Sequence, residues 1–283
     1  MLSALRAAQN RDGGWGYAGG SSWTEPTVYA LLALRAEPGS SQAVERGLAW
    51  LRGARRQDGG WAPHPAVDQS TWVTALVALL PPESTWDAPA QALEWLLRQT
   101  GSESAVAGRL RSWLLGGRPD YERRHAGWPW FPGAASWIAP TALTILALQK
   151  LQRRSADRRI EERVEAARKF LMSRVCRDGG WNHGASRALG YETDSYPETT
   201  GMALLALDGV AFPGLSKALA RAGRHLEQCR SAQASSWLEL GLLAHGKPAP
   251  QPKGPGGLCR STMDTALCLL AEKALRGNNL FLG

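Results

Sequence analysis

The chain has 283 residues, of which 44% are hydrophobic and 20% are charged. This balance is typical of a folded globular protein and excludes a wholly disordered one. The net charge of +8 is spread over short arginine clusters, without a basic and aromatic recognition motif, which argues against nucleic-acid binding. No apolar run is long enough to cross a membrane. Residues 1–9 form part of a repeat and not a secretory signal, so we expect a cytoplasmic protein.

The metal-binding residue types show no ligand pattern. The four cysteines include no C-x-x-C pair, and the five histidines are scattered along the chain. We therefore predict reduced thiols, no metal site and no metal cofactor.

Tryptophan is unusually frequent, with 13 copies against four phenylalanines. Several copies fall in a repeated turn. The sequence Q-N-R-D-G-G-W occupies 9–15, Q-D-G-G-W occupies 57–61 and R-D-G-G-W occupies 177–181, with a weaker H-A-G-W at 125–128. Repeats of this kind indicate one structural unit used several times. We expect Trp15, Trp61 and Trp181 to fill gaps between neighbouring units.

Two kinds of helix alternate with these turns. Runs rich in Ala and Leu, apolar on nearly all sides, predict buried helices over 24–34, 70–80, 139–148, 197–207, 236–244 and 261–271. Segments with one apolar stripe predict outer helices over 1–9, 41–54, 88–99, 160–175 and 216–229, with a further helix over 104–116.

Alternation of buried and amphipathic helices predicts a closed double ring. We therefore predict an all-α fold, an (α/α)6-type toroid of inner and outer helices, as a single domain over residues 1–283. The segment 247–257 holds too many prolines and glycines for a helix. An outer helix is therefore missing there, and we expect residues 1–9 to close the seam.

Gln9, Gly13 and Trp15 form a Q-x-x-x-G-x-W pattern. This pattern resembles the QW motif of squalene-hopene cyclases and of the wider prenyltransferase/squalene-oxidase repeat superfamily, which includes class II terpene cyclases. Arg55 and Val175 replace the glutamine in two partial copies. The repeat spacing extends the resemblance over the whole chain. It implies the toroid fold, and it says less about activity because one fold hosts many functions.

In the resembling cyclases, the middle Asp of a D-x-D-D motif protonates the substrate, and some relatives carry D-x-D-T-T. Aligning the buried runs places Glu198 at the position of that acid, followed by two threonines, while Tyr196 stands where the family has its first Asp. The resemblance therefore implies Glu198 as the catalytic acid. Just upstream, Glu192 and Asp194 are carboxylates that can compensate for the missing Asp. Capping of its own helix is the structural alternative for Glu198.

Further residues are candidates for substrate binding because they open the buried runs. Trp23, Trp72, Trp137 and Trp237 lie near the starts of these runs, and together they can line an apolar pocket for an isoprenoid or a carbocation. Packing between helices is the alternative. The same positions and the loops beside them add the polar candidates Glu25, His183, Tyr196 and Asp264.

We therefore predict a terpene cyclase-like enzyme that protonates an isoprenoid substrate. No cofactor is needed, and Mg²⁺ enters only if the substrate is a diphosphate. The zinc ligands of protein prenyltransferases are absent around Cys259. Three alternatives stay open: a non-catalytic isoprenoid or lipid binder, one subunit of a two-chain cyclase or homo-oligomer, and a glycan-acting toroid with paired carboxylates. Peripheral contact with a membrane is open as well.

Overall fold

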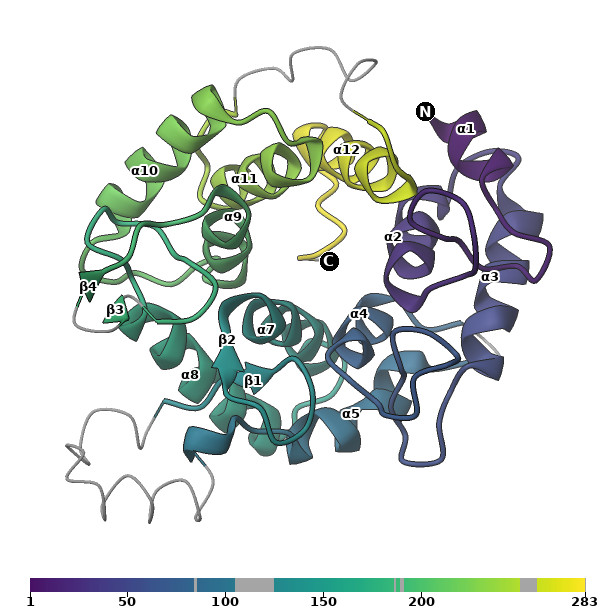
Figure 1. The fold of residues 1–283 in the computed structure, drawn as a ribbon, viewed down its shortest axis with the longest axis horizontal. Helices are drawn as coiled ribbons and strands as arrows, with labels where there is room; N and C mark the ends of the chain where they lie inside the picture. The colour runs from purple at the N-terminus through teal and green to yellow at the C-terminus, as the bar shows by residue number, and fades with distance from the viewer. Residues whose placement is uncertain (84–85, 105–124, 186, 189–190, 250–258, 283) are drawn as a thin grey trace.

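A computed structural model describes residues 1–83, 86–104, 125–185, 187–188, 191–249 and 259–282. Two concentric layers of helices surround one axis (Figure 1). In the described part of the chain, six helices form the inner ring, namely α2 (Thr24–Leu34), α4 (Val73–Leu79), α7 (Ile138–Gln152), α9 (Pro197–Ala206), α11 (Ala232–Ala244) and α12 (Thr262–Leu275). Each contacts the next in this order, and α12 contacts α2. The ring is therefore closed, and the predicted all-α toroid is confirmed.

The outer layer covers the inner ring from outside (Figure 1) and consists of α1 (Leu2–Ala7), α3 (Ser41–Gly53), α5 (Ala88–Arg98), α8 (Arg158–Ser173) and α10 (Leu215–Gln228). Helix α1 contacts both α2 and α12, so the prediction that the N-terminal residues close the seam is confirmed. Residues 105–116 of the helix predicted over 104–116, and residues 250–257 of the helix-breaking segment, lie outside the described residues. Ser104 ends a short 3-10 turn, η1 (Ser102–Ser104).

Two short antiparallel ladders lie in the loops at one end of the ring. Strand β1 (Trp128–Pro129) pairs with β2 (Ser136–Trp137), and β3 (Arg187–Ala188) pairs with β4 (Tyr191–Glu192). No helix of the described residues is long and apolar enough to span a bilayer.

The inner helices bury residues on every side because the ring packs against itself and against the outer layer. The closest approach is between α9 and α11, where a Cβ on Gly201 would overlap the main chain of Trp237. A side chain at this position would push the two helices apart, so glycine is required there.

The repeated tryptophans fix each outer helix to its inner partner. The Trp61 indole N–H donates to the Leu51 carbonyl at 2.8 Å, and the Trp61 main-chain N–H donates to Thr74 Oγ1 at 2.9 Å. The same pair of bonds recurs at Trp15, Trp128 and Trp181. All four indoles are at most 2% exposed. The predicted structural role of Trp15, Trp61 and Trp181 is confirmed.

One boundary differs from prediction in a way that matters for the site. Helix α11 begins at Ala232, about one turn before the predicted start at 236, because Ser231 Oγ accepts a hydrogen bond from the Ala234 N–H at 3.3 Å and caps the helix. Trp237 therefore lies more than a turn inside the helix. The prediction that it stands at the start of an inner helix, beside the other three tryptophans, is wrong.

Candidate active site

Four inner helices begin at an aromatic residue. Trp23, Trp72, Trp137 and Tyr196 are the N-cap residues of α2, α4, α7 and α9, and none of them makes a side-chain capping bond. Ser, Thr, Asp and Asn are the residues that normally stabilise this position. Aromatic side chains at four equivalent caps therefore need another explanation, and they gather at one end of the ring, which we call the mouth.

Neighbouring repeats supply main-chain hydrogen bonds at these helix starts. The Thr24 N–H donates to the Pro63 carbonyl, and the Ile138 N–H donates to the His183 carbonyl, at 3.0 and 2.9 Å. In the same way, the Trp72 N–H donates to the Trp130 carbonyl, and the Thr262 N–H donates to the Tyr17 carbonyl. In each case the acceptor follows a repeat tryptophan by two residues, so the next repeat partly satisfies the helix terminus in place of a side-chain cap.

Ring contacts continue around the mouth. The ring centroids of Trp23 and His64 lie 4.6 Å apart, those of Trp72 and Trp130 4.8 Å apart in a T-shaped pair, and those of His183 and Tyr196 4.7 Å apart. Several mouth rings remain exposed, Trp137 by 37% and Tyr196 by 52%. The mouth therefore presents aromatic faces and edges that can contact an apolar or cationic guest.

Two half-buried carboxyl groups stand just inside these rings. Glu25 and Glu198 each occupy the second position of their helices, α2 and α9, which lie three helices apart around the ring. Both carboxyls lie in the first turn of their helices. That placement also suits the helix dipole, so the helix terminus accounts for part of it.

The electrostatics of the two carboxyls are unusual. Burial raises the pKa of Glu25 to about 7, the hydrogen bond from Tyr17 opposes this rise, and the Glu198 charge adds to it. The Tyr17 hydroxyl donates to Glu25 Oε2 at 2.5 Å. Burial also raises the pKa of Glu198, and His183 opposes that rise. Carboxylic acids that hold their proton near neutral pH are typical of acid–base sites.

Tyr29 lies one helical turn below Glu25 on the same face of α2. It is 1% exposed, and its pKa is raised mainly by burial and further by the charges of Glu25, Glu198 and Tyr17. The Tyr29 ring contacts the Trp237 ring with centroids 6.0 Å apart. Trp237 thus belongs to the buried interior of the ring below the carboxyls.

Two other predicted residues lie apart from this pair. Asp264 accepts hydrogen bonds from the main-chain N–H groups of Arg260 and Ser261 at 2.8 and 2.9 Å, and it forms a capping box with Ser261. Its carboxylate is engaged by its own helix terminus. Asp194 is exposed in the loop before α9.

Sequence reasoning missed Tyr17, Tyr29 and Trp130, although a positional signal existed for each. Tyr17 and Trp130, like His183, follow a repeat tryptophan by two residues, and Tyr29 follows Glu25 by four. The two-residue offset is the one that places His183, already a candidate, after Trp181. The four-residue offset is the helical spacing that puts Tyr29 on the same face as Glu25.

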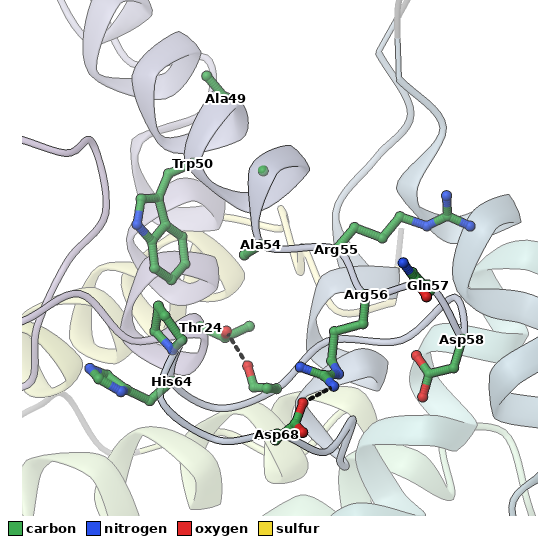
Figure 2. A pocket seen from close by; sticks show the side chains of 13 residues that line it. Thr24, Ala49, Trp50, Ala54, Arg55, Arg56, Gln57, Asp58, His64 and Asp68 are labelled. Atoms are coloured by element: carbon green, nitrogen blue, oxygen red, sulfur yellow. Dashed lines mark hydrogen bonds and ion pairs between the residues drawn. The ribbon is translucent and has the colours of Figure 1, made fainter.

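A hollow of about 850 Å³ opens beside the mouth, between α3 and the loops of the first two repeats (Figure 2). Thr24, Trp50 and His64 line one side, and Arg56 and Asp68 form an ion pair at 2.5 Å on another. Arg55 and Asp58 also line it, so the hollow is polar with charges of both signs.

No protein-family model matches this chain. The fold is a helical toroid shared with several solved enzymes. It is similar to the type II terpene cyclase MstE from Scytonema, with a TM-score of 0.54, 16% identity and coverage of 95% of this chain and 77% of that one. MstE has also been solved with the substrate geranylgeranyl dihydroxybenzoate. The terpene cyclase-like fold implied by the sequence resemblance is therefore present.

The same fold also resembles glycoside hydrolases. A GH8 endo-β-1,4-glucanase from an Achatina fulica gut metagenomic library gives a TM-score of 0.60 at 14% identity, over 96% of this chain and 97% of that one. Among curated proteins, drimenyl diphosphate synthase from Streptantibioticus cattleyicolor is 41% identical over 63 residues. That match spans 22% of this chain and only 12% of the relative. Identities this low between structures establish the fold alone.

Proposed function

We propose that this chain is a terpene cyclase-like enzyme that protonates an isoprenoid with a carboxylic acid and closes its rings at the aromatic mouth. One observation carries the proposal: two carboxyls with raised pKa values lie in the first turns of helices whose N-cap residues are aromatic. The fold likeness to MstE and the short match to drimenyl diphosphate synthase support the isoprenoid class of substrate.

Glu198 is the proton donor in this proposal. Burial favours its neutral form. Its proton passes to a terminal alkene carbon of the substrate, the neighbouring carbon becomes cationic, and the π electrons of the next alkene close the ring. The mouth tryptophans stabilise that charge through their ring faces.

Glu25 is the proton acceptor in this proposal. Loss of a proton from the cyclic cation forms the final alkene and balances the proton that Glu198 supplied. The Tyr17 hydroxyl already donates to Oε2 of Glu25, which stabilises the carboxylate form that accepts a proton. The two carboxyls then exchange the proton with solvent before the next turnover.

Product analysis tests this function. Purified protein is offered squalene, farnesyl diphosphate and geranylgeranyl diphosphate, with Mg²⁺ or with EDTA, and products are identified by gas chromatography and mass spectrometry. We expect cyclic products whose rate falls about 100-fold or more in Glu198→Gln. Glu227→Gln, at an exposed glutamate on the outer helix α10, is the matched control. Full activity of Glu198→Gln would overturn the assignment.

A glycan-acting function is the second candidate. It is favoured by the pair of carboxyls on opposite inner helices and by the GH8 likeness over nearly the whole length of both chains. Glycoside hydrolysis needs two such groups, one as acid and one as base or nucleophile. Release of reducing sugar from xylan or cellulose oligosaccharides, lost in both Glu25→Gln and Glu198→Gln, would favour this function over cyclisation.

A further inference from the structure

The chain that follows α12 turns into the ring. Gly277, with φ of +86°, makes the reversal after the helix, and the trace then runs to the interior of the inner ring (Figure 1). The Asn278 N–H donates back to the Lys273 carbonyl at 2.9 Å. Seen down the axis, this segment, residues 278–282, therefore ends within the outline of the inner ring (Figure 1).

Phe281 is the residue of this segment that contacts the ring interior most deeply. It is 1% exposed. Its ring centroid lies 5.1 Å from that of Trp237 on α11 and 6.4 Å from that of Tyr29 on α2. Three aromatic rings from separate parts of the chain thus form one buried cluster, which we call the aromatic floor.

Lys150 fixes the segment at the end of the ring opposite the mouth. Its Nζ donates to the Leu280 carbonyl at 2.9 Å and to the Leu79 carbonyl at 2.8 Å. Leu79 is the last residue of α4, and Lys150 lies in the last turn of α7. Burial lowers the pKa of Lys150 to about 8. The segment therefore enters from the far end and is held there by a buried ammonium group.

The aromatic floor lies directly below the candidate acids. Tyr29 contacts Phe281 and is also within the electrostatic influence of Glu25 and Glu198. At 1.5 Å per residue, Tyr29 lies about 6 Å below Glu25 and about 9 Å below Trp23 along α2. Phe281 therefore fills the interior of the ring beneath the carboxyls, together with Tyr29 and Trp237.

We propose that Phe281 closes the far end of the ring and sets the longest isoprenoid chain that the site accepts. This inference rests on the proposed function for its substrate class. The mouth and its carboxyls would bind the reacting end, and the aromatic floor would stop the chain. A smaller residue at 281 opens space for a longer chain, and a larger one excludes it.

Two opposite substitutions test the proposal. Phe281→Leu removes part of the ring volume and stays apolar, and Phe281→Trp enlarges it. The control is Phe170→Leu, since Phe170 is also 1% exposed but lies on the outer helix α8. The first readout is the ratio of the turnover rate with geranylgeranyl diphosphate to the turnover rate with farnesyl diphosphate. The second readout is the ratio of the binding affinities for geranylgeraniol and farnesol, measured by equilibrium dialysis, which does not depend on catalysis.

We expect Phe281→Leu to shift both ratios toward the longer chain by roughly tenfold or more, Phe281→Trp to shift them the other way, and Phe170→Leu to leave them unchanged. Unchanged ratios in folded Phe281 variants that still turn over isoprenoids would reject the chain-length role of Phe281 and leave the proposed cyclase activity standing. A shift in alcohol binding without any turnover would support the floor and reject the cyclase. Absence of both binding and turnover would reject both.

Discussion

The raised pKa of Glu25 makes a prediction about stability that does not depend on any substrate. The ordinary pKa of this side chain is 4.5, and its value in the folded protein is about 7. Each pKa unit corresponds to about 1.4 kcal/mol, so ionised Glu25 costs the folded state about 3 kcal/mol. In Glu25→Gln the amide is neutral at every pH, and its oxygen can still accept the Tyr17 hydrogen bond.

The sign of the pH dependence follows from linkage. The folded state binds the proton more tightly than the unfolded chain, so wild-type stability falls as the pH rises from 4.5 to about 7 and the loss is complete above that value. We therefore expect Glu25→Gln to be close to wild type at about pH 4.5 and to be stabilised by about 3 kcal/mol at about pH 8. In a chain of this size that gain raises Tm by roughly 6 °C.

Thermal and urea unfolding of both proteins at the two pH values measures the difference. Glu227→Gln is the matched control, because Glu227 is an exposed glutamate on the outer helix α10. The reasoning is refuted by a stability difference that is the same at both pH values, or by destabilisation of Glu25→Gln at the higher one.

Three further predictions follow from single contacts. Tyr17→Phe removes the hydrogen bond to Glu25, so the pKa of that carboxyl should rise further, as ¹³C NMR of labelled glutamate would show; an unchanged titration contradicts the assignment. Thr74→Val leaves the buried main-chain N–H of Trp61 without its acceptor. Urea unfolding should therefore show that the free energy of unfolding falls by about 1–3 kcal/mol. An unchanged free energy of unfolding would mean that water replaces the hydroxyl. The sulfurs of Cys259 and Cys268 lie 3.2 Å apart, so diamide should oxidise the two thiols to one disulfide while diamide itself is reduced to its hydrazine. Peptide mass mapping detects the disulfide. Two free thiols after treatment would contradict this prediction.

The ring itself was predictable because its pattern is local and repeated. Turn, buried run and amphipathic run recur along the chain, and the predicted inner and outer segments in the described residues became helices, with α11 beginning about one turn early. Glu25 and Glu198 were also within reach, because the same offset from their repeats puts them at the same helical position.

What sequence could not supply is contact between distant repeats. The influence of Glu198 on Glu25 depends on closure of the ring. Phe281 meets Trp237 only because the chain after α12 reverses at Gly277. Trp237 was misplaced for a local reason, since Ser231 caps a helix whose first turn lacks the apolar character of the rest.

The bond from each repeat tryptophan to the preceding outer helix also bears on how such a chain can change its length. In the first, second and fourth repeats the indole donates to a carbonyl ten residues earlier, and at Trp128 the acceptor, Leu96, is 32 residues earlier. The same junction is made although the intervening segment is about three times as long. The junction between α5 and Trp128 is therefore preserved across a longer connection, so the length of this connection is not what holds the outer helix to its tryptophan.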